Sequence, residues 1–156
     1  MDEESGWSLR AGRAEDVEPV AELRAVVLRD DLERLGRYDE HRVRQRLRDG
    51  FSPAYTSIVE TAGGDLAGCV TLRLDARGDG FHLEHFYLSP DVQGRGWGTE
   101  VLRRLLDRAD AAPAPVRLTV LQGSPARRLY DRVGFTIESE DPVDVRMVRF
   151  PPPPPR

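Results

Sequence analysis

Residues 81–111, FHLEHFYLSPDVQGRGWGTEVLRRLLDRADA, predict a strand, a glycine-rich turn and an amphipathic helix. Aromatic and aliphatic residues dominate Phe81–Leu88, as they do in strands, and the Ser-Pro-Asp sequence that follows stops the run. After the turn, arginines and aspartates alternate with apolar residues at helical spacing, namely Val101, Leu102, Leu105, Leu106 and Ala109. We therefore expect the chemistry of the protein to be built on this stretch.

The turn itself, QGRGWGT at residues 93–99, favours an anion. Its three glycines stand at alternate positions, where the missing Cβ atoms let a ligand approach the backbone and permit positive φ. A helix that begins here presents unpaired amide N–H groups and the positive end of its dipole, roughly half an elementary charge. The turn therefore predicts a site for a pyrophosphate.

Two better-known phosphate loops do not fit this turn. A dinucleotide fingerprint that begins at Gly94 would need glycine where Thr99 stands, and a P-loop needs a lysine, which the chain lacks. The pattern that does fit is Gln-x-x-Gly-x-Gly, formed by Gln93, Gly96 and Gly98. A glycine-rich helix entry without a ligand is the alternative interpretation.

A second block, SPARRLYDRVGF, occupies residues 124–135 and predicts a short helix. Ser124 can cap this helix, Pro125 suits its first position and Gly134 can end it. A strand is expected before it, at Val116–Leu121, and two strands after it, at residues 135–139 and 143–150.

Together the two blocks resemble the Gcn5-related N-acetyltransferase (GNAT) family. The first is similar to that family's coenzyme A pyrophosphate loop, and the second to its Asn-Pro-Ala-Arg-x-Leu-Tyr-x-x-x-Gly-Phe block, with Ser124 where asparagine is common. The order of predicted elements also resembles the family: a strand, two helices, three strands, a helix, a strand, a helix and two strands.

The resemblance implies an α/β fold of the layered α+β kind. Its central sheet is mixed and mostly antiparallel, is flanked by about four helices and has splayed central strands. We expect one domain over residues 1–150 and a disordered proline-rich tail at residues 151–156.

The resemblance also implies acetyl-CoA as the co-substrate. In the family, the pantetheine pairs with the central strand, here the backbone of Phe86, Tyr87 and Leu88. The remaining residues that the resemblance assigns to cofactor binding are Gln93, Gly94, Arg95, Gly96, Trp97, Gly98, Thr99, Ser124 and Arg127.

Acetyl transfer to an amine needs a base, because an alkylammonium has a pKa of about 10. Glu84 is the favoured base, since apolar neighbours on the strand favour the protonated form of a carboxyl group and make it more basic. Strand alternation puts His82 on the same face, as the alternate base, and His85 on the other face. A structural or idle role for these side chains is the competing interpretation.

The departing thiolate can take a proton from an acid, and Tyr130 matches the family's tyrosine at that place. An aromatic ring that only packs beneath the helix is the alternative. No metal is expected, because His82 and His85 are three apart on a strand and point to opposite faces.

Composition excludes several classes of protein. No apolar run approaches the ~20 residues that span a bilayer, and the first ten residues lack a signal-peptide core, so we expect a cytoplasmic protein without membrane contact. A net charge of -4 with dispersed arginines argues against a nucleic-acid partner. The lone Cys69 lies in a strand-like run and is expected to be a buried hydrophobe, which excludes a disulfide framework.

Contacts with the acceptor are expected from residues 29–41, because loops over a rigid scaffold carry specificity. Four acids there could attract a cationic amine, although a solvated charged face is the alternative: Asp30, Asp31, Glu33 and Asp39. The function we expect is acetyl-CoA-dependent N-acetyl transfer, directly to a primary amine of a small molecule or of a peptide or protein N-terminus. A non-catalytic acyl-CoA-binding sensor or partner-binding domain is the alternative, and a homodimer stays open.

Overall fold

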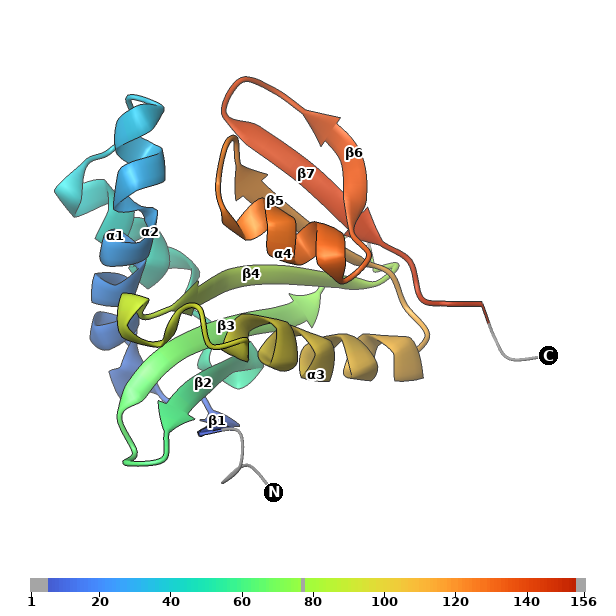
Figure 1. Cartoon of the computed structure of the whole chain (residues 1–156), viewed down its shortest axis with the longest axis horizontal. Coiled ribbons are helices and arrows are strands. Elements are labelled where there is room, and N and C mark those ends of the chain that lie inside the picture. The colour runs from blue at the N-terminus through green and yellow to red at the C-terminus, as the bar shows by residue number, and fades with distance from the viewer. Residues whose placement is uncertain (1–5, 77, 154–156) are drawn as a thin grey trace. The chain divides into compact units, whose positions relative to one another are not determined.

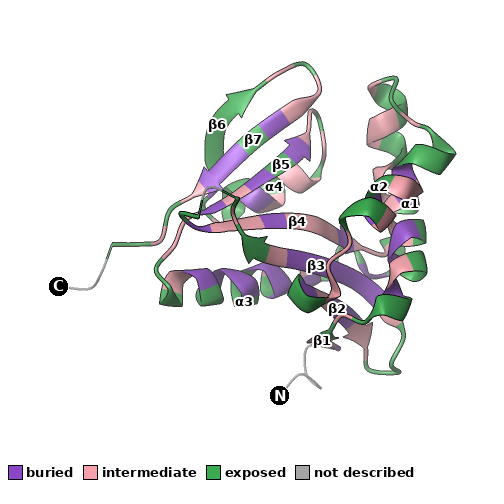
Figure 2. Cartoon of the chain, turned by 180° about the vertical axis from the view of Figure 1, so that it is seen from behind, coloured by how far each residue is buried: buried purple, intermediate pink, exposed green. Residues whose placement is uncertain are grey.

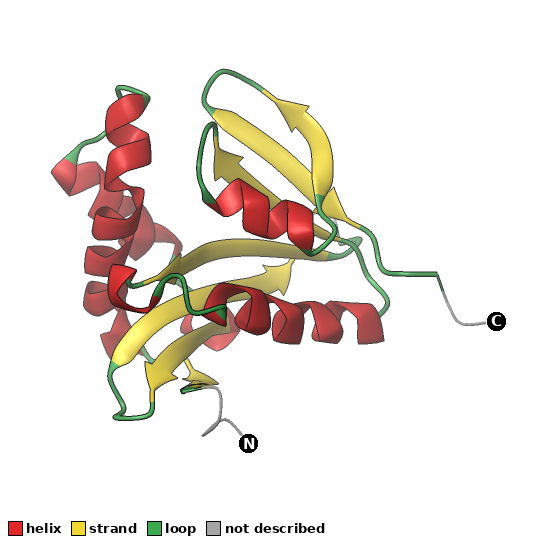
Figure 3. Cartoon of the chain, in the orientation of Figure 1, coloured by secondary structure: helices red, strands yellow, loops and turns green. Residues whose placement is uncertain are grey.

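The computed structural model describes residues 6–76 and 78–153, which contain strands and helices in the predicted order (Figures 1 and 3). The strands and α-helices are β1 (Trp7–Ala11), α1 (Val17–Arg34), α2 (Glu40–Gly50), β2 (Thr56–Thr61), β3 (Leu66–Leu74), β4 (Phe81–Leu88), α3 (Trp97–Ala111), β5 (Val116–Leu121), α4 (Ala126–Arg132), β6 (Thr136–Glu140) and β7 (Asp144–Arg149).

The strands form one seven-stranded sheet in the order β1-β2-β3-β4-β5-β7-β6. The pairs β1/β2, β2/β3, β5/β7 and β6/β7 are antiparallel, whereas β4 and β5 are parallel. This confirms the expected mixed, mostly antiparallel sheet. The pairs Phe81↔Val116 and His82↔Arg117 join the first residues of β4 and β5, which is the end at which splayed strands would remain paired.

The chain divides into two compact units that alternate along the sequence. Unit 1 comprises Met1–Thr71 and His85–Trp97, and unit 2 comprises Leu72–Glu84 and Gly98–Arg156, so β3 and β4 contribute to both. The single domain expected over residues 1–150 therefore stays a prediction. The disordered tail also stays a prediction: residues 151–153 lie outside regular secondary structure, and residues 154–156 lie outside the described part of the chain.

The core of unit 1 is built from the two helices and the strands beneath them, with α1 and α2 side by side (Figure 1). Its buried members are Val20, Ala21, Leu47, Ile58, Cys69 and Tyr87. Cys69 is buried as predicted, and burial raises the pKa of its thiol to about 12. A thiol that keeps its proton is a poor nucleophile, so Cys69 acts as a packing residue.

A buried carboxylate fastens the start of α1 to the sheet. Asp16 is 5% exposed and accepts hydrogen bonds from both terminal nitrogens of Arg10, at 2.8 Å each. The Arg10 guanidinium lowers the pKa of Asp16, and the backbone N–H of Arg13 acts in the same direction, against the opposing effect of burial. Because Arg10 on β1 also pairs with Glu60 on β2, one network joins three elements.

Unit 2 contains most of the amphipathic helix α3 and an arginine of β7 that links three of its segments. Figure 2 shows buried residues along one side of α3, as the helical spacing predicts. Arg149 on β7 pairs with Asp110 on α3 at 2.8 Å and donates to the carbonyl oxygen of Val133 after α4. Gly134 follows with φ of +102°, a conformation that suits the predicted helix end.

Some predicted boundaries are wrong by one or two residues. Pro125 precedes α4 as its N-cap and is not its first residue, although the Ser124 Oγ still accepts a hydrogen bond from the N–H of Ala126 at 3.2 Å. β6 begins at Thr136, one residue after the predicted start at residue 135. These shifts leave the order of the elements unchanged.

Candidate functional site

The glycine-rich turn has the backbone that its sequence predicts. Gly94 and Gly96 have φ of +80° and +81°, a region that side chains disfavour. The Gln93 side-chain amide donates to the carbonyl oxygen of Leu88 at 2.9 Å, which holds the start of the turn to the end of β4. The turn runs directly into α3, whose first N–H groups have no acceptor within the helix. These residues fit a bound pyrophosphate.

An arginine lies beside the first turn of α3. Arg132 Nη1 donates to Thr99 Oγ1 at 3.3 Å. A cation at a helix N-terminus is unfavourable by itself, because that end already carries partial positive charge, so this arrangement favours an anion there. No local sequence pattern predicts Arg132 at this place, since it is separated from Thr99 by 33 positions.

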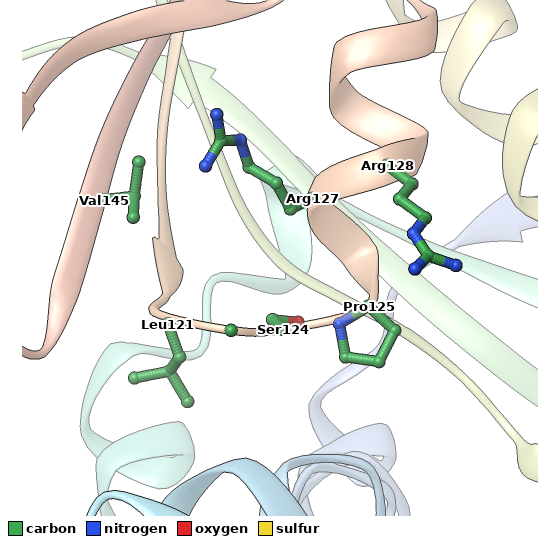
Figure 4. A pocket seen from close by; sticks show the side chains of 7 residues that line it. Leu121, Ser124, Pro125, Arg127, Arg128 and Val145 are labelled. Carbon is green, nitrogen blue, oxygen red and sulfur yellow. The ribbon is translucent and has the colours of Figure 1, made fainter.

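The second block forms the wall of a cavity of about 330 Å³ between the end of β5, the start of α4 and β7 (Figure 4). The structure here brings together Ser124 and Arg127, two residues predicted to bind the cofactor. Arg128, which was not predicted, lines the same cavity. In Figure 4 the two guanidinium groups extend to opposite sides of the start of α4. Arg127 is also paired with Asp131 at 3.3 Å.

Tyr130 lies on α4 and is buried. Its ring meets that of Phe135 edge to face, with centroids 5.8 Å apart and planes at 68°. This contact is the packing role that the sequence left open. The predicted role as an acid concerns the hydroxyl, which takes no part in the contact between the rings.

The first half of β4 holds the two predicted bases close together. Nε2 of His82 lies 3.8 Å from Oε2 of Glu84, so both side chains share one face as alternation predicts. The prediction of apolar surroundings for Glu84 is wrong, because Arg73 on β3 pairs with its carboxylate at 2.7 Å. The carboxylate therefore has a charged partner on the neighbouring strand.

The second half of β4 begins with an irregular residue. His85 has φ of +49°, and it is the only non-glycine residue with positive φ in the described ranges 6–76 and 78–153. Its Nδ1 lies 3.3 Å from the hydroxyl of Tyr87, which also accepts a hydrogen bond from Arg24 Nε at 3.0 Å. Sequence alternation gave no sign of this break in the strand.

Most of the acids expected to attract the acceptor have partners of their own. Asp31 pairs with Arg34 at 2.8 Å and Glu33 pairs with Arg29 at 3.1 Å. Asp39 caps α2 by accepting the N–H of Arg42 at 2.8 Å. The solvated charged face, kept as the alternative, describes Glu33 and Asp39, which are exposed, whereas the Asp31 side chain is only 13% exposed.

The described residues lack two features. They contain no cluster of three or more histidine, cysteine, aspartate or glutamate side chains that could hold a metal ion. No helix within residues 6–76 and 78–153 combines the length and the apolar character needed to cross a bilayer.

Comparison with protein families decides the relationship. The sequence profile of the acetyltransferase (GNAT) family matches residues 19–135, which include β4, the glycine-rich turn and α4. The chain belongs to the GNAT family. The resemblance drawn from the two sequence blocks is thus confirmed. A comparison with curated protein sequences finds no significant match.

Solved structures of GNAT acetyltransferases share the fold. The PaiA N-acetyltransferase from Thermoplasma acidophilum, in complex with coenzyme A, aligns with a TM-score of 0.74 at 20% identity, over 92% of this chain and 98% of that one. A chimera of the spermidine N-acetyltransferase SpeG from Vibrio cholerae and hSSAT gives 0.67 at 18% identity, over 93% and 95%. N-acetylglutamate synthase from Neisseria gonorrhoeae, complexed with coenzyme A and L-arginine, gives 0.65 at 23% identity, over 93% of this GNAT chain and 33% of the synthase.

Proposed function

We propose that this GNAT protein is an N-acetyltransferase that moves the acetyl group of acetyl-CoA directly to a primary amine of a small molecule or of a peptide or protein N-terminus. The observation that carries the proposal is the turn between β4 and α3. Its two positive-φ glycines and the arginine beside Thr99 suit a pyrophosphate, and the family match includes the turn. The relatives crystallised with coenzyme A support the same donor.

In this proposal the chain holds the donor mainly through backbone groups. Residues 93–99 offer amide N–H groups to the pyrophosphate, and Phe86, Tyr87 and Leu88 offer backbone groups to the pantetheine. Ser124 and Arg127 supply further polar contacts from the wall of the cavity at the start of α4. Backbone donors fixed by glycine conformations need no rearrangement when the anion binds.

Proton transfer in this proposal falls to side chains of β4 and α4. Glu84 accepts the proton that the acceptor ammonium must lose, and His82 is the alternate for the same step. A backbone N–H of the central strand stabilises the negative charge that develops on the acetyl oxygen. The nitrogen–carbon bond forms, the carbon–sulfur bond breaks, and Tyr130 gives a proton to the departing sulfur. The nitrogen loses its second proton to water as the amide forms, and Tyr130 and Glu84 return to their starting forms by proton exchange with water.

The proposal is tested by following the loss of thioester absorbance from acetyl-CoA with a panel of amines, peptides and aminoglycosides. This measurement needs no thiol reagent and so avoids side reactions with Cys69. We expect multiple turnovers with at least one class of acceptor. Tight binding of acetyl-CoA with no turnover across the panel would instead support the acyl-CoA sensor.

A further inference from the structure

Arg24, on α1, is a partly buried arginine whose partners in the described part of the chain are all uncharged. Its Nε donates to the hydroxyl of Tyr87 at 3.0 Å, and its Nη1 donates to the carbonyl oxygen of Val43. No described carboxylate lies within ion-pair distance of it. By contrast, Arg44 and Arg48 on the neighbouring α2 are paired with glutamates of α1.

Arg24 contacts β4, the strand whose backbone is proposed to bind the pantetheine. The hydroxyl that accepts its hydrogen bond belongs to Tyr87, whose backbone is proposed to pair with the pantetheine. The same hydroxyl lies 3.3 Å from Nδ1 of His85. On the other edge of that imidazole, Gly50 ends α2 without a side chain, and a Cβ there would lie 3.5 Å from Nε2. The Arg24 guanidinium, the Tyr87 hydroxyl and the His85 imidazole therefore lie together where α1, α2 and β4 come together.

Three of the four acids of residues 29–41 that could attract a cationic amine have partners of their own. The acids Asp31, Glu33 and Asp39 are held by neighbouring arginines or by a helix cap. The guanidinium of Arg24 has no counter-ion among the described residues, and its Nη2 makes no hydrogen bond to them. A guanidinium with an open edge is suited to a carboxylate, which accepts parallel hydrogen bonds from it.

We propose that Arg24 binds a carboxylate of the acceptor, so that the acceptor class is amines that also carry a carboxylate, such as amino acids. The inference rests on the proposed function and narrows its substrate. Arg24 is then a residue of the acceptor site, held in place by Tyr87 and Val43. The opposing explanation is that Arg24 only clamps α1 to α2 and β4, in which case its loss would weaken the fold without changing selectivity.

The test compares amino acids with their carboxamides, which keep the amine and lose the carboxylate charge. We expect Arg24→Gln to raise the KM of an amino acid about tenfold to a hundredfold, with a smaller change in kcat and an unchanged KM for the amide. Arg46→Gln is the matched control, because Arg46 is an exposed arginine on α2 without a partner in the described chain, and it should change neither KM. Equal losses with both acceptors in Arg24→Gln would overturn the inference and support the clamp.

Binding measured without chemistry separates this inference from the proposed function. In the presence of coenzyme A, which carries no acetyl group, calorimetry of wild-type protein should show tighter binding of the amino acid than of its amide. Equal affinity would overturn the inference even if other amines are acetylated. Absence of turnover with every amine would count against the proposed function, while the binding preference is judged by itself. Should Arg24→Gln fail to fold, this wild-type comparison still decides.

Discussion

The two halves of β4 are made from similar residues and differ in structure. In residues 81–84 the side chains form a cluster of titratable and charged groups: His82 lies beside Glu84, and Arg73 forms an ion pair with the Glu84 carboxylate. In residues 85–88 the backbone leaves the regular strand at His85, and the Tyr87 side chain is buried at 8% exposure. The halves also fall in different compact units. One irregular residue thus separates the side chains that we propose for proton transfer from the backbone that we propose for pantetheine binding.

The largest expected effect is on the backbone-binding half, which leads into the glycine-rich turn. Gly96→Asp adds a side chain at a φ of +81° and places a negative charge where the pyrophosphate is proposed to lie. We expect the dissociation constant for coenzyme A, measured by calorimetry, to rise about a hundredfold through like-charge repulsion. Gly64→Asp is the matched control, because Gly64 has φ of +87° and open space in the β2–β3 hairpin. Unchanged affinity in folded Gly96→Asp protein would remove the loop assignment.

The charged half is tested by Glu84→Gln, which keeps a hydrogen-bonding shape beside Arg73 and abolishes proton acceptance. We expect kcat to fall about a hundredfold, while affinity for acetyl-CoA stays the same. His82→Gln, made alongside it, should have the smaller effect. If His82→Gln lowers kcat more, the two residues exchange roles, and if neither variant loses activity, this half of the strand takes no part in proton transfer.

Tyr130→Phe tests whether a residue outside β4 contributes to proton transfer, by giving a proton to the departing sulfur. The substitution keeps the ring against Phe135 and removes the hydroxyl. We expect turnover to fall about tenfold, less than in Glu84→Gln, because a thiol pKa of about 8.5 makes the thiolate a fair leaving group without help. Steady-state kinetics with acetyl-CoA varied would show the loss in kcat. Wild-type turnover would leave Tyr130 with packing alone.

Local patterns sufficed for much of this molecule. Hydrophobic spacing predicted the helices and strands in order, and the alternate glycines predicted the positive-φ turn, because both depend on residues a few positions apart. The burial of Cys69 followed from the apolar strand around it.

The features that sequence reasoning missed depend on distant residues. Arg24 reaches Tyr87 across 63 positions, and Arg132 reaches Thr99 across 33. A Cβ on Gly68 would lie 2.5 Å from the carbonyl oxygen of Tyr87, so that glycine is needed for close approach of β3 to β4. Such contacts depend on how the whole chain packs, and no short segment of the sequence contains both partners.

The smallest expected effect concerns the irregular backbone of β4 at His85. It is the sign of the difference in unfolding free energy between an alanine and a glycine variant. His85→Ala and His85→Gly both remove the imidazole, but only alanine is strained at φ of +49°, so we expect the glycine variant to be more stable by about 1 kcal/mol. At the adjacent Glu84, which lies in regular strand, alanine should be more stable than glycine by about 0.5–1 kcal/mol, because glycine loses more backbone freedom on folding. Urea unfolding of the four variants gives both differences with each side chain already removed. The same sign at both positions would mean that His85 is not strained, and the division of β4 into two halves would then lack its physical cause.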